Sequence, residues 1–322
     1  MIHDITERAV RGIAATVEEA LDLDRSCSTD ELCDAAGEIT RARFGNRIDT
    51  CSIANARSGR CSEDCKWCAQ SRHWATGIDE YDVIPLDKAM ALADASAARG
   101  VGHFSLVTSG RRVAAPQMEK FCSIYREIRR RHPRLRLCAS MGLLDAPAMH
   151  ALREAGVDRY HCNLETSADY FPQLCSSHTR ADKLATIAAA RAEGLEVCSG
   201  GIIGMGETME QRLRMVREAV EAGAMSVPLN ILSPIPGTPL GEMPLLEEEE
   251  IVRTGALMRF VAPDVWIRFA GGRARMSAES VERMLTGGVN GVMIGDLLTT
   301  GGNRPHDDFV TFGRLGLDSA TD

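Results

Sequence analysis

The chain has 322 residues, 44% of them hydrophobic and 25% charged, and its formal net charge of −8 argues against a nucleic-acid partner, since nucleic-acid-binding proteins present basic stripes. No apolar run reaches about 18 residues, and the charged N-terminus MIHDITERAV lacks an apolar segment, so we expect neither a membrane span nor a secretory signal. We therefore expect a cytoplasmic protein whose 11 cysteines are not paired in disulfides.

The first part of the chain, residues 1–45, carries apolar residues at helical spacing. Ser28, followed by Asp30 and Glu31, is typical of a helix N-cap with an acidic first turn. We expect these residues to form an N-terminal helical extension. Residues 46–322 contain no linker, repeat or low-complexity segment, and we expect them to form a single barrel domain with a C-terminal segment.

Beyond the helical extension, short apolar runs alternate with amphipathic stretches that mostly end at glycine. Eight strands that are each followed by a helix predict an α/β fold, a TIM-type (β/α)8 barrel. An open doubly wound sheet is the alternative, but the glycine-rich loop that it needs after its first strand is missing. The predicted strands are residues 51–56, 102–108, 135–140, 159–165, 196–203, 226–232, 265–271 and 291–295.

Sulfur-containing and polar residues coincide with these strands or follow them directly. In a parallel barrel the carboxyl ends of the strands build the active site, so residues at that face are expected to meet. The stretch CSEDCKWC, residues 61–68, follows the first strand. The later strands contribute Cys138, Cys162, Cys198, Asn230 and Arg268.

The stretch CSEDCKWC holds three cysteines, Cys61, Cys65 and Cys68, with Trp67 before the last of them. Zinc sites and ordinary electron-transfer clusters use four protein ligands, whereas three thiolates leave one iron of a four-iron cluster open to an outside ligand. A zinc loop completed by His73 is the alternative. Nothing else in the sequence is typical of a zinc ribbon, which favours the iron–sulfur interpretation.

The same stretch resembles the CxxxCxΦC signature (Φ is aromatic) of the radical S-adenosylmethionine (SAM) superfamily. The order of SGRCSEDCKWCAQS, YHCNLETS, VCSGGIIGMGET, SVPLNIL, IRFAGGR and LLTTGGN is further similar to the biotin synthase family, over about residues 45–316. This resemblance implies a sulfurtransferase that converts dethiobiotin to biotin, the last step of biotin biosynthesis. It also implies an electron donor such as flavodoxin or ferredoxin, and a homodimer. Another radical SAM enzyme of the same barrel family, acting on a different small molecule, is the alternative.

The resemblance also implies roles for individual residues. The three signature cysteines would hold a [4Fe–4S] cluster that SAM completes, and Trp67 would lie against the adenine of SAM. The ureido ring of dethiobiotin suits an amide side chain, which offers both a donor and an acceptor. SAM would further contact Asn163, Glu165, Gly200, Ile202, Gly204 and Glu207, and dethiobiotin would contact His161, Asn163 and Asn230.

A second, auxiliary iron–sulfur cluster supplies the sulfur in the well-known form of the family, held by three cysteines and one arginine. Cys138, Cys198 and Arg268 match three of these positions and would hold the sulfur-donor cluster. Ser105 stands at the strand-two position of the third cysteine, and a hydroxyl is a poor ligand where soft thiolates are preferred. Cys162 could replace that thiolate if a bulge turned it inwards, because neighbouring strand residues alternate faces. Arg268 could instead pair with charge, since a guanidinium stays protonated.

The remaining cysteines are expected to pack as small hydrophobic residues. Cys51 begins the first strand, at the end expected to lie away from the active face. The cysteines that are expected only to pack are Cys27, Cys33, Cys51, Cys122 and Cys175.

The sequence leaves open whether the auxiliary cluster is [2Fe–2S] or a variant, which residues complete its ligand set, and how its sulfur is replaced.

Overall fold

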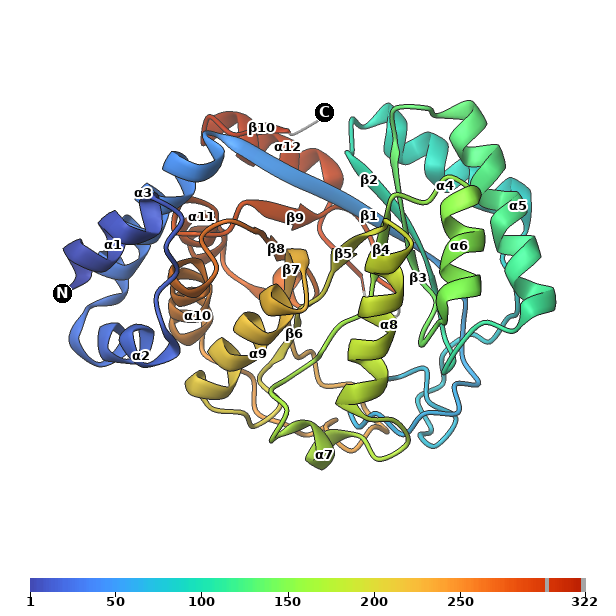
Figure 1. The fold of residues 1–322 in the computed structure, drawn as a ribbon, viewed down its shortest axis with the longest axis horizontal. Coiled ribbons are helices and arrows are strands. Elements are labelled where there is room, and N and C mark those ends of the chain that lie inside the picture. Colours follow the sequence, from blue (N-terminus) through green and yellow to red (C-terminus); the bar gives the residue numbers. More distant parts are fainter. Residues whose placement is uncertain (299–300, 320–322) are drawn as a thin grey trace.

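The computed structural model describes residues 1–298 and 301–319, and its strands form a closed barrel surrounded by helices (Figure 1). All strand pairs in the barrel are parallel. The ring closes at β1 (Arg47–Arg57), which pairs with β2 (His103–Thr108) on one side and β9 (Gly291–Met293) on the other. The expected TIM-type α/β barrel is therefore confirmed. Its other strands are β3 (Arg136–Ser140), β4 (Arg159–His161), β5 (Glu196–Cys198), β6 (Gly201–Ile203), β7 (Ala224–Ile231) and β8 (Trp266–Phe269).

The fifth position of the barrel is shared by two short strands, where the sequence predicts one. Both β5 and β6 pair with β7, and Ser199 and Gly200 separate them. A Cβ atom on Gly200 would lie 2.1 Å from the carbonyl oxygen of Pro228. Only glycine allows the backbone to come this close to β7. This close approach at Gly200 coincides with the break between β5 and β6.

Helices cover the outside of the barrel in the order that the alternating sequence pattern predicts (Figure 1). Among the described residues, no helix combines the length and the apolar character that crossing a membrane requires. The covering helices are α4 (Leu86–Ala98), α5 (Ala115–Arg131), α6 (Ala146–Glu154), the single turn α7 (Phe171–Leu174), α8 (Arg180–Ala192), α9 (Met209–Glu221), α10 (Glu248–Val261), α11 (Ala278–Thr286) and α12 (Pro305–Arg314).

The N-terminal helices α1 (Ile2–Val10), α2 (Val17–Ser26) and α3 (Thr29–Phe44) lie on one side of the barrel, against α9, α10 and α11 (Figure 1). Ser28 caps α3 as expected: its hydroxyl accepts from the amide of Glu31, whose carboxylate accepts from the amide of Ser28 at 2.8 Å. Buried residues of these helices belong to the same hydrophobic cluster as the barrel. Burial against the barrel, together with the caps, holds the extension in place.

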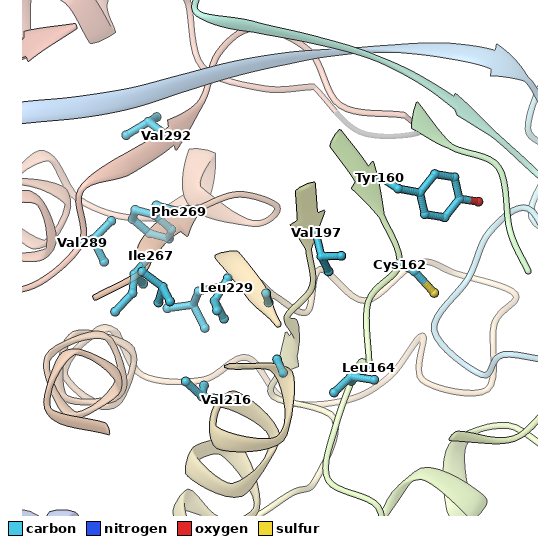
Figure 2. Packing of buried hydrophobic residues seen from close by; sticks show 14 of the residues in the cluster. Tyr160, Cys162, Leu164, Val197, Val216, Leu229, Ile267, Phe269, Val289 and Val292 are labelled. Atoms are coloured by element: carbon cyan, nitrogen blue, oxygen red, sulfur yellow. The ribbon is translucent and has the colours of Figure 1, made fainter. Parts of the chain in front are cut away.

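The hydrophobic core lies between the barrel and its helices. Alternate residues of each strand point outwards into this layer, as Figure 2 shows for Tyr160, Val197 and Ile267. The residues between them point into the barrel, where they are largely polar or contain sulfur. Because a strand has a period of two, one sequence supplies both an apolar outer face and a reactive interior.

Candidate active site

A cavity of about 360 Å³ lies inside the barrel, between the inner faces of the strands and the loop that follows β1. Its size suits a small organic ligand, since such pockets typically span about 300–1,000 Å³. Most residues that the sequence assigns to the site meet here, although they come from five different barrel positions and one loop. They are Trp67, Cys68, Cys138, His161, Asn163, Glu165, Cys198, Ile202, Asn230 and Arg268, and Ser105 lies among them.

The loop with the three signature cysteines lies across one side of this cavity. Cys68 lines the cavity and, like Cys65, is half-buried, whereas Cys61 is buried. The amide of Cys61 donates to the carbonyl of Gln70, and that of Cys68 donates to the carbonyl of Cys65 at 3.1 Å. Burial raises the pKa of the Cys68 thiol to about 11. Binding of a metal at neutral pH therefore has to release the proton of this thiol.

Asn163 and Glu165, which follow β4, are held against the glycine-rich segment. The Asn163 carbonyl accepts from the amide of Gly200 at 3.1 Å, and its NH2 group donates to the Glu165 carboxylate at 3.3 Å. Glu165 has a φ of +72°, which is rare outside glycine. Its backbone pairs with Gly201, where a Cβ atom would lie 2.2 Å from the Glu165 carbonyl oxygen. These contacts present the Glu165 carboxylate to the cavity.

Three of the expected cofactor contacts shape the loop instead of lining the cavity. Both oxygens of Glu207 are occupied inside the protein: they accept from the amides of Gly204 and Met205 at 2.8 Å each and from Arg212 at 2.7 Å. Gly204 has a φ of +92°, as the turn requires. Gly200, Gly204 and Glu207 therefore do not line the cavity, and their contact with SAM stays a prediction.

Asn230 lines the cavity as expected, but its amide also joins two parts of the barrel. Its NH2 group donates to the carbonyl of Gly201 at 3.1 Å, and its carbonyl accepts from the amide of Gly271 at 2.9 Å. One N–H and one lone pair remain, which is enough for a ligand with a donor and an acceptor. Asn230 can therefore serve the structure and a ligand at the same time.

Cys138 and Cys198 are deeply buried in the interior, with Arg268 beside them. The Nη1 atom of Arg268 lies 3.7 Å from the Cys198 sulfur. Burial raises the pKa of the Cys198 thiol, but the imidazole of His161 and the guanidinium of Arg268 together bring it down to about 6. The environment of this thiol thus favours the thiolate, the form that binds metals.

Arg268 is a cation that pairs with charge, because its guanidinium is also bonded to the carboxylate of Asp49. Burial works against its charge, but Asp49 and the neighbouring thiols raise the pKa of Arg268 further. A protonated guanidinium has no lone pair to offer iron. This geometry favours the charge-pairing interpretation of Arg268 over the metal-ligand interpretation.

The amino-terminal end of the barrel interior, called the floor from here on, holds buried charged side chains that sequence analysis missed. The carboxylate of Asp49 lies 2.9 Å from His103 and 3.5 Å from Arg159, which also bonds Glu196 at 3.0 Å. Asp49 is two residues from Cys51 on β1, so its inward direction could have been inferred once the inner face of β1 was known. The Asp49 carboxylate and the Arg159 guanidinium therefore lie below the thiols, and the Arg268 guanidinium bonds Asp49 from the level of the thiols.

Cys162 does not line the cavity. Its thiol lies in the hydrophobic layer outside the barrel, between Tyr160 and Leu164 (Figure 2). The strand alternation is maintained here, because His161 and Asn163 on either side of it point inwards. The suggestion that a bulge turns Cys162 towards the auxiliary cluster is therefore wrong.

Two cysteines that were expected only to pack have chemical neighbours. Cys51 points into the cavity, which corrects the expectation that it lies away from the active face. Cys175 lies 3.7 Å from the sulfur of Cys65 and 3.3 Å from the Nδ1 atom of His178. The hydrogen bond from Cys65, helped by His178, lowers the pKa of Cys175 to about 4 even though burial raises it. Cys175 therefore belongs to the surroundings of the signature loop.

Comparisons with known proteins agree with this arrangement. Residues 56–219 match the model of the radical SAM superfamily, and residues 228–318 match that of the biotin and thiamin synthesis associated domain. The biotin synthase of Porphyromonas gingivalis is 45% identical over 322 residues, covering 100% of this chain and 97% of that protein. The biotin synthase of Desulfotalea psychrophila is 46% identical over 320 residues, covering 98% and 95%.

This chain belongs to the biotin synthase family. Two solved structures with low sequence identity share the fold of this chain. Methylornithine synthase superposes with a TM-score of 0.81 at 18% identity, covering 98% of this chain and 97% of that one. The hydrogenase maturase HydG superposes with a TM-score of 0.82 at 14% identity, covering 100% of this chain and 76% of that one.

The cofactors of the biotin synthase family are a [4Fe–4S] cluster, SAM and an auxiliary iron–sulfur cluster, and the residues present fit them. The signature loop offers three thiols and no fourth. Within the barrel, Arg159 Nη1 and Arg268 Nε are buried and have no hydrogen-bond acceptor among the described residues. Unpartnered buried donors favour an anionic group, and an iron–sulfur cluster with thiolate ligands is anionic.

The close contact of Gly201 with the Glu165 backbone predicts how a substitution at Gly201 changes SAM binding. The Gly201→Ala variant is expected to weaken SAM binding about 5- to 150-fold, because its Cβ atom has to displace the Glu165 backbone, and such overpacking costs about 1–3 kcal/mol. Isothermal titration with SAM under anaerobic conditions measures this. Gly313→Ala is the control: its Cβ atom meets nothing within 4 Å, and SAM binding should be unchanged. Equal affinities in the two variants would contradict the prediction.

Proposed function

We propose that this member of the biotin synthase family inserts sulfur into dethiobiotin to form biotin, and that the sulfur comes from an auxiliary iron–sulfur cluster inside the barrel. One observation carries the proposal: a single cavity joins the signature loop to buried thiols deeper in the barrel, Cys138 and Cys198. A dethiobiotin molecule between them would face a radical source on one side and a sulfur source on the other.

When bound, SAM and the [4Fe–4S] cluster supply a 5′-deoxyadenosyl radical that removes hydrogen from unactivated carbon atoms, and the auxiliary cluster supplies the sulfur. The chain positions these groups and excludes water. Trp67 and Ile202 line the cavity near the signature loop, and Ile53 and Val107 add apolar wall. An enclosed apolar wall limits side reactions of a reactive intermediate.

Polar side chains between the two ends of the cavity suit dethiobiotin. Asn230 keeps one donor and one acceptor free, which matches the N–H and C=O groups of a ureido ring. His161 lies beside Cys198; burial opposes its charge, but the thiol raises the pKa of His161. An imidazole beside Cys198 can therefore take up a proton more readily than an imidazole in water, which helps to offset the charge of a thiolate there. Asn163 is placed to contact both SAM and the substrate.

Another radical SAM enzyme of the same barrel family, acting on a different small molecule, is the alternative. The buried thiols argue against it, because a radical SAM enzyme without a second cluster has no use for them. A flavodoxin or ferredoxin as electron donor and a homodimeric assembly are further proposals, which rest on the resemblance to the family. A cytoplasmic location is also a proposal; it is supported by the free thiols of all 11 cysteines, each of which lies in the described part of the chain.

The proposed function has a direct test. The reconstituted protein is incubated anaerobically with dethiobiotin, SAM and a strong reductant, and the products are identified by mass spectrometry. We expect both biotin and 5′-deoxyadenosine. Formation of 5′-deoxyadenosine without biotin would retain the radical chemistry and overturn the substrate assignment.

A further inference from the structure

The auxiliary cluster has lost one thiolate on the second barrel strand, where Ser105 stands. A hydroxyl oxygen is a hard ligand and a poor replacement for sulfur on iron. Cys162 cannot compensate, because it lies outside the barrel. The described structure has to provide another ligand if Cys138 and Cys198 are to hold a cluster.

We propose that Cys51, on β1, is the third thiolate ligand of the auxiliary cluster. This inference rests on the proposed function, and it assigns the missing ligand to a strand that contributes none in the well-known form of the family. Cys51 is 3% exposed, and its side chain lines the same cavity as those of Cys138 and Cys198, which are 4% and 3% exposed. The three thiols therefore form one buried group.

The strand register places Cys51 in the same layer as the other ligands. In a TIM-type barrel each interior layer takes four side chains from alternate strands, and the register shifts by eight residues around the ring. Cys51 lies opposite His103 on β2, and Cys138 lies opposite Ser105, two residues further along β2. Each step to the next alternate strand therefore advances the register by two residues.

The same step recurs around the barrel. Cys138 lies opposite Arg159 and Cys198 opposite His161, two residues further along β4. On β7, Cys198 lies opposite Ser226, and Arg268 lies opposite Pro228, two residues further along. On β9, Arg268 lies opposite Gly291, and Cys51 lies opposite Met293, again two residues further along. Four such steps make eight residues and close the ring. Strands β1, β3, β5 and β8 therefore contribute one complete layer: Cys51, Cys138, Cys198 and Arg268.

Ser105 belongs to a different layer. The register places it one layer nearer the carboxyl ends, on β2 with His161 on β4 and Met293 on β9. The missing strand-two thiolate is thus replaced on the neighbouring strand and one layer deeper, closer to the charged floor. Arg159 is also paired with Glu196, but the Nη1 atom of Arg159 and the Nε atom of Arg268 are buried without a hydrogen-bond acceptor among the described residues, which favours a further anionic group near this depth.

The test separates the auxiliary cluster from the radical SAM cluster. A background variant with Cys61, Cys65 and Cys68 all replaced by alanine has lost the ligands of the [4Fe–4S] cluster, so its remaining iron reports the auxiliary site. The protein is reconstituted anaerobically with iron and sulfide, and bound iron, bound sulfide and the Mössbauer spectrum are recorded. Addition of Cys51→Ala to this background is expected to lower bound iron, because even the loss of an outer-shell partner costs about 10–100-fold in metal affinity and the loss of a ligand should cost at least as much.

The matched control is Cys162→Ala in the same background, because Cys162 is also a buried thiol, directly after β4, but lies outside the cavity. It should retain its iron and its spectrum. Cys51→Ser preserves the side-chain volume and decides the question if the alanine variant does not fold, which circular dichroism reports. Retention of the full iron content and an unchanged Mössbauer spectrum in a folded Cys51 variant would overturn the proposal.

Iron binding does not depend on the reaction catalysed. If the wild-type protein forms no biotin but the Cys51 variants lose iron, the proposed function fails and the ligand assignment stands. If biotin is formed and the Cys51 variants keep their iron, the function stands and the ligand assignment fails. The two measurements therefore distinguish the two ideas.

Discussion

The Cys68→Ala variant is expected to lose 5′-deoxyadenosine formation completely. Cys68 lines the cavity beside Trp67, and it is one of only three thiols that the signature loop offers to the cluster. A four-iron cluster with an open site needs all three thiolates, so removal of one leaves a second iron without a protein ligand. Anaerobic incubation with SAM and reductant, followed by chromatography of the nucleoside product, measures the effect.

The control for this variant is Cys122→Ala. Cys122 is a buried thiol in α5 that belongs to the hydrophobic cluster and does not line the cavity. Loss of its sulfur should cost some stability but leave 5′-deoxyadenosine formation near the wild-type rate. If Cys68→Ala and Cys122→Ala formed the nucleoside at similar rates, the assignment of the signature loop as the cluster site would be wrong.

The Asp49→Ala variant is expected to lose about 3–5 kcal/mol of unfolding free energy, because removal of one partner leaves buried charge without compensation. Asp49 is 2% exposed, and its carboxylate bonds Arg268 and faces Arg159 at 3.5 Å. Both guanidinium groups would stay buried after its loss. Urea denaturation of the protein without clusters, followed by circular dichroism at neutral pH, measures this change.

The control is Asp264→Ala, which removes a surface ion pair with Arg43; their side chains are 48% and 35% exposed. Exposed pairs contribute about 0–1 kcal/mol, so this variant should unfold close to the wild type. A similar small effect for Asp49→Ala would show that the floor of the barrel is hydrated or able to rearrange.

The stabilising effect of Asp49 also has a defined pH dependence. Burial raises the pKa of this carboxyl group, but Arg268 and His103 outweigh it and hold the pKa below its usual value. A carboxyl group whose pKa is lowered on folding stabilises the native state above its unfolded pKa of about 3.9, and this contribution is lost as the pH falls. The difference in unfolding free energy between wild type and Asp49→Ala should therefore shrink in acid.

Several features of this protein follow from local sequence alone. The alternation of apolar runs with amphipathic stretches ending in glycine predicts the parallel barrel, because a parallel strand pair needs a crossover helix. The Ser28 cap and the spacing of Cys61, Cys65 and Cys68 are equally local. The cap and the cysteine spacing each depend on residues within a few positions of one another, so a short stretch of sequence is enough to predict them.

The roles of other residues depended on non-local contacts. Gly204 and Glu207 are predicted cofactor contacts, and the structure adds that the Glu207 carboxylate accepts hydrogen bonds from Arg212 and from backbone amides of its own loop. A motif can identify such a residue but cannot show where its hydrogen bonds go. Asn230 similarly joins Gly201 to Gly271, two segments that only the closed barrel brings together.

The cysteines show most clearly which features the sequence predicts and which depend on the tertiary structure. Strand alternation in the sequence already indicated that Cys162 points away from His161 and Asn163, and the structure agrees. The sequence by itself determined the period of each strand, and hence which residues share a face. Only the tertiary structure decided that Cys51 lies level with Cys138 and Cys198. The reason is physical: depth in a barrel depends on the hydrogen-bond register summed around the whole ring of strands, and no single strand contains it.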